Sequence, residues 1–281
     1  MKTIAPHALR TAALAACALF ATPALAQDET DPPKPITVSG SVALVSDYRF
    51  RGVSQTDEEI AVQGGFTVSH ESGFYVGTWG SNLAGWGTFG GANLELDVFG
   101  GYKMEVTPGV AIDVGLTWYM YPGGFAKTDF AEPYVKVSGS YGPVSLLAGV
   151  AYAPPQQALG NWSNLPGSRV GDKEDNLYVW ADASVGVPNT GLTAKAHIGH
   201  SSGNPGLGPN GTSLSPTGEY LDWLVGLDFT VPSTPLTLGV AYTDTDIANV
   251  ERTYILPNFS STKDGGRIDG GQVVFSVTAA F

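Results

Sequence analysis

Apolar and polar residues alternate with a period of two along most of the chain, and this pattern restricts the possible folds most. The clearest segment spans residues 110–121, with apolar residues at Val110, Ile112, Val114, Leu116, Trp118 and Met120. Successive side chains of a β-strand point to opposite faces, so such a segment has one apolar and one polar face. The sequence predicts about twelve strands, at about 36–51, 60–69, 73–82, 93–104, 110–121, 129–140, 144–153, 177–185, 191–200, 220–229, 236–244 and 271–281.

The connections between these segments alternate in length. Short turns at 71–73, 105–109, 142–143, 186–191 and 232–235 follow the even-numbered segments. Longer connections follow the odd-numbered ones, most clearly at 154–173, 201–218 and 245–270. A soluble sandwich has no reason for this alternation, whereas an up-and-down outer-membrane barrel has short periplasmic turns and longer external loops. An even number of strands also places both termini on the periplasmic side.

The low content of charged residues also points to a protein surrounded by lipid. Charged residues make up 14% of the chain, against about 25% in soluble domains. No stretch approaches the about 18 consecutive apolar residues of a membrane-spanning helix, so a helical membrane protein is excluded. A sheet in lipid must close because its backbone groups have no water to pair with. We therefore predict an all-β fold, a transmembrane antiparallel up-and-down β-barrel of about twelve strands over residues 37–281.

The first 26 residues have the features of a secretory signal peptide. A basic start is followed by a short apolar core, and the predicted cleavage lies between Ala26 and Gln27. A lipidation site at Cys17 is the competing interpretation. Residues 27–36 are polar and proline-rich, which predicts an extended periplasmic leader. With ordinary cleavage the single cysteine is lost, which excludes thiolate catalysis and cysteine-ligated metals.

The last segment ends in a pattern of its own. Apolar residues alternate back from the terminus at Phe281, Ala279, Val277 and Phe275. A terminal phenylalanine preceded by such residues resembles the assembly signal of bacterial outer-membrane proteins. The expected partners are therefore the outer-membrane assembly machinery and outer-membrane lipid, although an ordinary final strand would show the same alternation.

Several longer motifs resemble one family. Residues 44–56 (LVSDYRFRGVSQT) followed by 62–66 (VQGGF) are similar to the opening of the TorF family of porins. Residues 73–82 (GFYVGTWGSN), 95–97 with 101–102, and 119–123 (YMYPG) fit the same family. The resemblance covers about residues 37–281 and implies an outer-membrane β-barrel of a Gram-negative bacterium. It implies no substrate and no catalytic residues.

Three charged residues alternate near the start of the predicted barrel. Asp47, Arg49 and Arg51 share one face, which we expect to point into the lumen. They could form a charged constriction that selects solutes. Alternatively they belong to a structural network of ion pairs with Glu95, Asp97 or Glu132, because burying an unpaired arginine is costly.

The predicted inward face is acidic overall. Its acids are Asp47, Glu95, Asp97, Asp113, Glu132, Asp182, Asp222 and Asp228. Its bases are Arg49, Arg51, Lys103, Lys136 and Lys195. This balance predicts a weak preference for cations, since charges in the lumen tune selectivity. The net charge of −12 also argues against nucleic acid as a partner.

Aromatic residues fall on both predicted faces. Parity places Tyr48, Phe50, Trp118, Tyr152 and Trp223 outward, as interfacial girdles. Parity is inward or uncertain for Tyr75, Trp79, Tyr119 and Trp180, which either fill the lumen or form a stacking track for sugars or bases.

Metal and catalytic sites find little support. Acidic loops at 57–59, 172–175 and 244–246 could bind divalent cations, but their spacing matches no EF-hand, so no metal and no cofactor is predicted. An outer-membrane hydrolase would need His200 with Ser201, Ser202 or Asn204. His197 lies three residues before His200 and so faces the other side of the strand. We therefore predict no enzyme but a channel for small polar solutes, with a plugged structural or adhesive barrel, or less favourably the hydrolase, as alternatives.

Overall fold

The computed structural model describes residues 35–88, 91–124, 127–160, 172–205, 214–215, 217–248 and 260–281. The predicted signal peptide, its cleavage site at Ala26 and Gln27, and nearly all of the leader lie outside these ranges. In the described part of the chain, no helix has the length and apolar character needed to cross a membrane. A short 3-10 helix, η1 (Gly85–Thr88), lies between β5 and β6.

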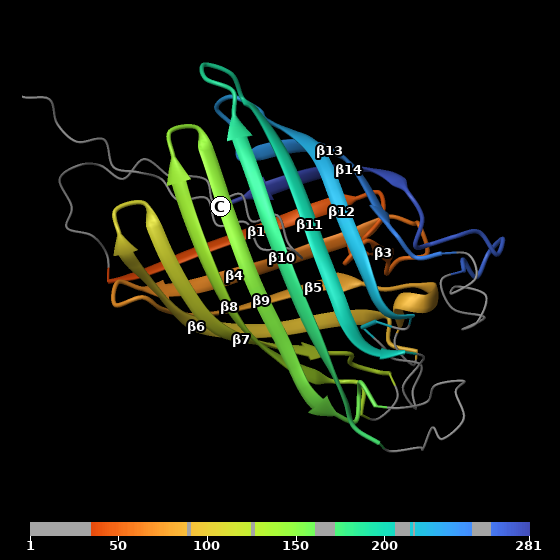
Figure 1. Cartoon of the computed structure of the whole chain (residues 1–281). Helices are drawn as coiled ribbons and strands as arrows, with labels where there is room; N and C mark the ends of the chain where they lie inside the picture. The colour runs from red at the N-terminus through yellow and green to blue at the C-terminus, as the bar shows by residue number, and fades with distance from the viewer. Residues whose placement is uncertain are drawn as a thin grey trace, which may run out of the picture.

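Twelve antiparallel strands form a closed barrel, as the alternation predicts (Figure 1). Each barrel strand pairs with the next barrel strand along the chain, and β1 closes the barrel by also pairing with β14. The barrel strands are β1 (Ile36–Val45), β4 (Ala61–His70), β5 (Phe74–Asn82), β6 (Leu94–Thr107), β7 (Val110–Met120), β8 (Phe130–Tyr141), β9 (Val144–Gln156), β10 (Glu174–Gly186), β11 (Leu192–Pro205), β12 (Thr217–Thr230), β13 (Leu236–Thr245) and β14 (Gln272–Ala280).

The two faces of the strands differ as they do in a transmembrane barrel. Outward positions hold exposed apolar side chains, such as Ile198 (53%) and Val225 (55%). Inward positions hold charged groups and buried aromatic rings, including those of Trp79 and Trp180. A water-soluble barrel would have its apolar side chains inside and its charges outside.

The last residue completes the closure of the barrel. The Gly40 N–H donates to the Phe281 carbonyl over 2.8 Å, and the Phe281 N–H donates to the Gly40 carbonyl over 2.9 Å. Gly40 has no room for a Cβ, because one would lie 2.7 Å from the Phe281 ring. Phe275, Val277 and Phe281 are all exposed on the outer face of the β1–β14 seam.

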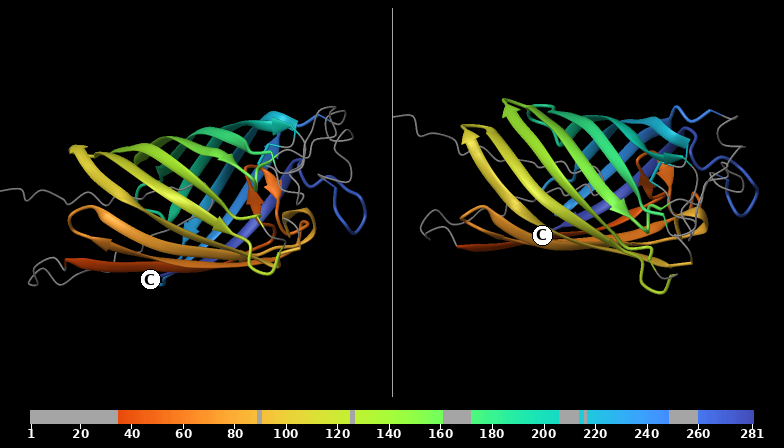
Figure 2. Two further views of the ribbon diagram at one scale, coloured as in Figure 1. Left: turned by 90° about the horizontal axis from the view of Figure 1, so that it is seen from below. Right: turned by 60° about the horizontal axis from the view of Figure 1, so that its bottom comes forward.

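A small hairpin inside the barrel was not predicted. The first predicted strand continues to Arg51, but β1 ends at Val45, and β2 (Arg49–Phe50) pairs with β3 (Val53–Ser54). Figure 2 shows this hairpin, in orange, within the barrel at the end where the long connections lie. The outward placement of Tyr48 and Phe50 is therefore wrong: their exposures are 3% and 7%. Trp118 and Tyr152 do face outward, with exposures of 45% and 43%.

Candidate functional site

The segment from β1 to β4, residues 46–60, crosses the barrel interior and is called the inner loop below. Arg51 at the hairpin tip reaches strands far from β1 in the order around the barrel. Its Nη2 donates to Glu132 Oε1 on β8 over 2.6 Å, and its Nη1 donates to Asn176 Oδ1 on β10 over 2.7 Å. The guanidinium also lies 4.0 Å from the ring centroid of Tyr178.

Burial and the Arg51 contacts act on its protonation in opposite directions. Burial lowers the pKa of the guanidinium, but Glu132, Tyr119 and Tyr178 together raise it by more, so the net pKa is above its usual value. Arg51 therefore stays charged, and the buried pair with Glu132 is a fixed tie between the inner loop and β8.

A second set of contacts holds the inner loop at the barrel mouth. Arg49 Nε donates to Asp47 Oδ2 over 2.5 Å, and its Nη1 donates to the carbonyls of Gly52, Ile268 and Gly270. Its Nη2 donates to Glu58 Oε1 over 3.1 Å. Burial raises the pKa of the Glu58 carboxyl, an effect that Arg49 partly offsets. The inner loop is thus bound to the connection that precedes β14.

Aromatic rings fill the interior on one side of the inner loop. The Tyr48 and Trp79 ring centroids are 5.4 Å apart, and those of Phe50 and Tyr119 are 6.0 Å apart. Phe130 stacks on Tyr119 at 4.5 Å. These residues belong to one buried apolar cluster, which reaches from the inner loop to β5, β7 and β8. The four inward aromatics that the alternation left uncertain thus line the interior, two of them, Trp79 and Tyr119, within this cluster.

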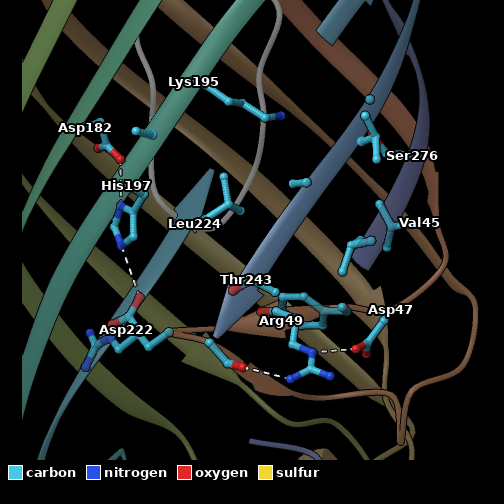
Figure 3. A pocket seen from close by; sticks show the side chains of 18 of the residues that line it. Val45, Asp47, Arg49, Asp182, Lys195, His197, Asp222, Leu224, Thr243 and Ser276 are labelled. Atoms are coloured by element: carbon cyan, nitrogen blue, oxygen red, sulfur yellow. Dashed lines mark hydrogen bonds and ion pairs between the residues drawn. The ribbon is translucent and has the colours of Figure 1, made fainter. Parts of the chain in front are cut away.

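The other side of the inner loop borders a cavity of about 200 Å³ that combines charged side chains with an apolar wall. Figure 3 shows His197 between two acids: its Nδ1 lies 2.6 Å from Asp182 Oδ1 and its Nε2 lies 3.1 Å from Asp222 Oδ1. Lys195 Nζ donates to Asp228 Oδ1 over 2.7 Å. The opposite lining is small and uncharged, with Gly239, Ala241, Thr243, Val274 and Ser276 from β13 and β14.

The structure places the predicted lumen acids inside the barrel but does not bring them all together. Glu132 pairs with Arg51, as the ion-pair interpretation allowed, whereas Glu95 and Asp97 pair with neither arginine. Both are nonetheless buried, at 2% and 5% exposure. Further along the barrel, Lys136 Nζ lies 3.1 Å from Asp113 Oδ2.

Two residues that contact Arg51 were not predicted from the sequence to do so. Parity places Tyr178 and Asn176 inward, but nothing in the sequence pairs them with Arg51. The signal that could have helped is glycine: Trp180 lies opposite Gly149 on β9, and its ring occupies the space of a Cβ there. Tyr178 reaches over Gly199 of β11 in the same way. A glycine diagonal to or opposite an inward aromatic residue marks a ring that lies flat along the wall.

The hydrolase alternative is not supported by the described residues. His200 faces outward, and its Nε2 lies 3.8 Å from Glu219 Oε2. Ser201 faces the interior and is fully buried, with its Oγ hydrogen bonded to Asn176. No hydrogen bond joins His200 to a serine in the part of the chain that the structure describes, and the Asn204 side chain lies outside it. A nucleophile and base within hydrogen-bond reach are therefore not found there.

Solved structures with this fold include two porins. The NanC porin matches with a TM-score of 0.53 and 10% identity, over 87% of this chain and 99% of that one. The KdgM porin matches with a TM-score of 0.51 and 8% identity, over 86% of this chain and 98% of that one. At such low identity the likeness shows the fold alone. No curated protein matches the sequence.

The sequence also matches a family model over residues 29–281, which includes the inner loop and every barrel strand. The model is described as a bacterial protein of unknown function, Gcw_chp. This description differs from the TorF resemblance, which stays a prediction. The chain belongs to the bacterial family Gcw_chp, whose member here folds as a twelve-stranded porin-like barrel.

Proposed function

We propose that this protein is an outer-membrane channel for the passive diffusion of small polar solutes. The observation that carries the proposal is the cavity, with charged side chains in its lining, between the inner loop and the small-residue wall of β13 and β14. The apolar outer face suits lipid, and the charged inner face suits water and polar solutes. The porin fold and the TorF resemblance both support the same interpretation.

The cavity favours small solutes over large ones. On one side Arg49 and Arg51 are fixed by buried contacts, and on the other Gly239, Ala241 and Ser276 leave room beside them. A twelve-stranded barrel is narrower than the 16–18-stranded porins with wide aqueous channels. We therefore propose a passage confined to the β12–β14 side of the barrel.

A weak preference for cations follows from the ion pairs. Four inward bases are matched to acids, as Arg49–Asp47, Arg51–Glu132, Lys136–Asp113 and Lys195–Asp228. Asp182 and Asp222 share one base, His197, and all three line the cavity. These two acids give the cavity a local excess of negative charge, which attracts cations.

One observation favours a second candidate, a structural barrel with a closed lumen. The inner loop lies inside the barrel at the end with the long connections, and the aromatic cluster packs against it. In that case the cavity would be an enclosed space that does not conduct.

Recordings from refolded protein in planar bilayers separate the two candidates. A channel gives discrete openings, and a salt gradient gives a reversal potential on the cation side. Persistent silence from protein that shows the heat-modifiable gel mobility of a folded barrel would instead support the structural barrel.

A further inference from the structure

The tip of the inner loop has an unfavourable residue for its turn. Arg51 and Gly52 form the two-residue connection between β2 and β3, with φ values of 48° and 80°. Two-residue hairpin turns with both φ values positive strongly favour Asn-Gly or Gly-Gly, because other residues adopt this conformation at a cost. Gly52 also packs against Thr245, which leaves no room for a Cβ. The turn itself thus explains the glycine but not the arginine.

The contacts of the Arg51 side chain do explain the arginine. Its side chain is 3% exposed and that of Glu132 is 4% exposed, so the pair is shielded from water. Asn176 and the Tyr178 ring complete the surroundings of the guanidinium. Removing one member of such a pair leaves a buried charge without its partner, which is strongly unfavourable. Arg51 therefore holds the hairpin tip against β8 and β10.

The inner loop also covers two acids that have no ion pair in the described chain. Tyr48 lies against Trp79, and Trp79 is the cross-strand partner of Asp97 on β6. Glu95 lies two residues before Asp97 on the same inward face. Asp97 Oδ1 is buried and accepts no hydrogen bond from the described residues. Buried acceptors without a hydrogen bond are rare in native structures. The segment that covers Asp97 here is the inner loop and not a strand of the barrel wall.

We propose that the inner loop is a plug held in place by the Arg51–Glu132 pair, and that its release opens a second passage lined by Glu95 and Asp97. This inference rests on the proposed channel function and adds its regulation. We call the Arg51–Glu132 pair the latch. While the latch is intact, the latched state, solutes use the cavity on the β12–β14 side. In the released state Tyr48 leaves Trp79, and the two carboxylates meet water and cations.

Two substitutions break the latch from opposite sides. Arg51→Asn removes the charge and supplies a residue that the turn favours, so the hairpin itself is not weakened. Glu132→Gln removes the partner on β8 and leaves the loop sequence unchanged. Asp175→Asn is the matched control, because Asp175 lies at the outer rim and accepts a hydrogen bond from Tyr152. Heat-modifiable gel mobility checks that each variant folds.

Single-channel conductance in planar bilayers tests the latch. We expect R51N and E132Q each to raise conductance at least about twofold over the wild type, because a filled part of the lumen opens. D175N should match the wild type. Wild-type conductance in both R51N and E132Q would overturn the inference. If R51N does not fold, E132Q alone decides.

The two acids provide a readout that a merely weakened barrel would not show. The double substitution E95Q/D97N should leave the cation-to-anion permeability ratio of the wild type unchanged and lower that of R51N. An equal effect in both backgrounds would overturn the inference.

The latch and the channel can fail separately. A silent wild type with a conducting R51N rejects the open channel but supports the latch. A conducting wild type with an unchanged R51N rejects only the latch, and silence in every variant rejects both.

Discussion

Inward glycines and aromatic rings are matched across the strands of this barrel. A Cβ at Gly115 would lie 2.5 Å from Tyr134 Cζ, and one at Gly149 would overlap the Trp180 ring. Because each ring lies along the wall over a glycine, large side chains fit inside a narrow barrel. Part of the high glycine content, 37 residues in the sequence, is thus explained by rings that lie directly against glycines and not by turns.

We expect Gly149→Ala to lower the free energy of unfolding by about 1–3 kcal/mol, the usual cost of overpacking. Gly139→Ala is the matched control, because a Cβ there would lie 3.6 Å from its nearest neighbour, which is ordinary contact. Urea unfolding in lipid vesicles, followed by tryptophan fluorescence, measures both. Equal stability of the two variants would contradict this packing.

The Asp113–Lys136 pair gives a prediction about selectivity. Lys103 is the cross-strand partner of Asp113 on the other side, so Asp113→Asn leaves two lysines without this acid. D113N should shift the reversal potential toward anions, and Lys136→Gln should shift it toward cations, as lumen charges tune selectivity. Shifts of the same sign in both variants would show that neither residue faces the conducting path.

At the level of elements, the period of two predicts the barrel strands but conceals the hairpin. The alternation of Asp47, Arg49 and Arg51 continues beyond Val45 without a break, because β2 is also extended. A strand pattern therefore cannot tell a wall strand from a hairpin folded into the lumen. The positive φ of Arg51 and its pairing with Glu132, 81 residues away, depend on barrel closure, which local sequence does not specify.

The β1–β14 seam gives a prediction at this scale. Its register contains five residue pairs, against ten for β1–β4, so the contacts of Phe281 are a large part of the closure. Phe281→Ala should lower the fraction of protein that refolds to the heat-modifiable form. Phe74→Ala, which removes an exposed ring from the end of β5 that follows a short turn, is the control. A loss of folding in both variants alike would mean that the seam is not special.

For the whole molecule, the inverted faces account for the shortage of charge in the sequence. Among the described residues, charged side chains lie in the lumen, where most are paired, or in the connections and at the strand ends. The middle of the outer surface is apolar, as in Leu116 (40% exposed) and Val225 (55% exposed). The acidic balance of the chain is therefore mainly a property of the lumen and the loops.

Arginine substitutions at two depths along the strands test whether the apolar outer surface faces lipid. We expect Leu116→Arg, near the middle of β7, to cost about 2–4 kcal/mol of stability in a bilayer, whereas Ile36→Arg at the start of β1 should cost about 0–1 kcal/mol. Unfolding in vesicles measures the difference. Equal costs would mean that the outer surface does not sit in a bilayer at this depth.

The central claim is that small polar solutes diffuse through this barrel. Swelling of proteoliposomes that contain the refolded wild type measures this directly, with neutral polar solutes of increasing size. We predict swelling with the smallest solutes at rates that fall steeply with size. An absence of swelling with every solute, from vesicles shown to contain folded barrel, would contradict the claim.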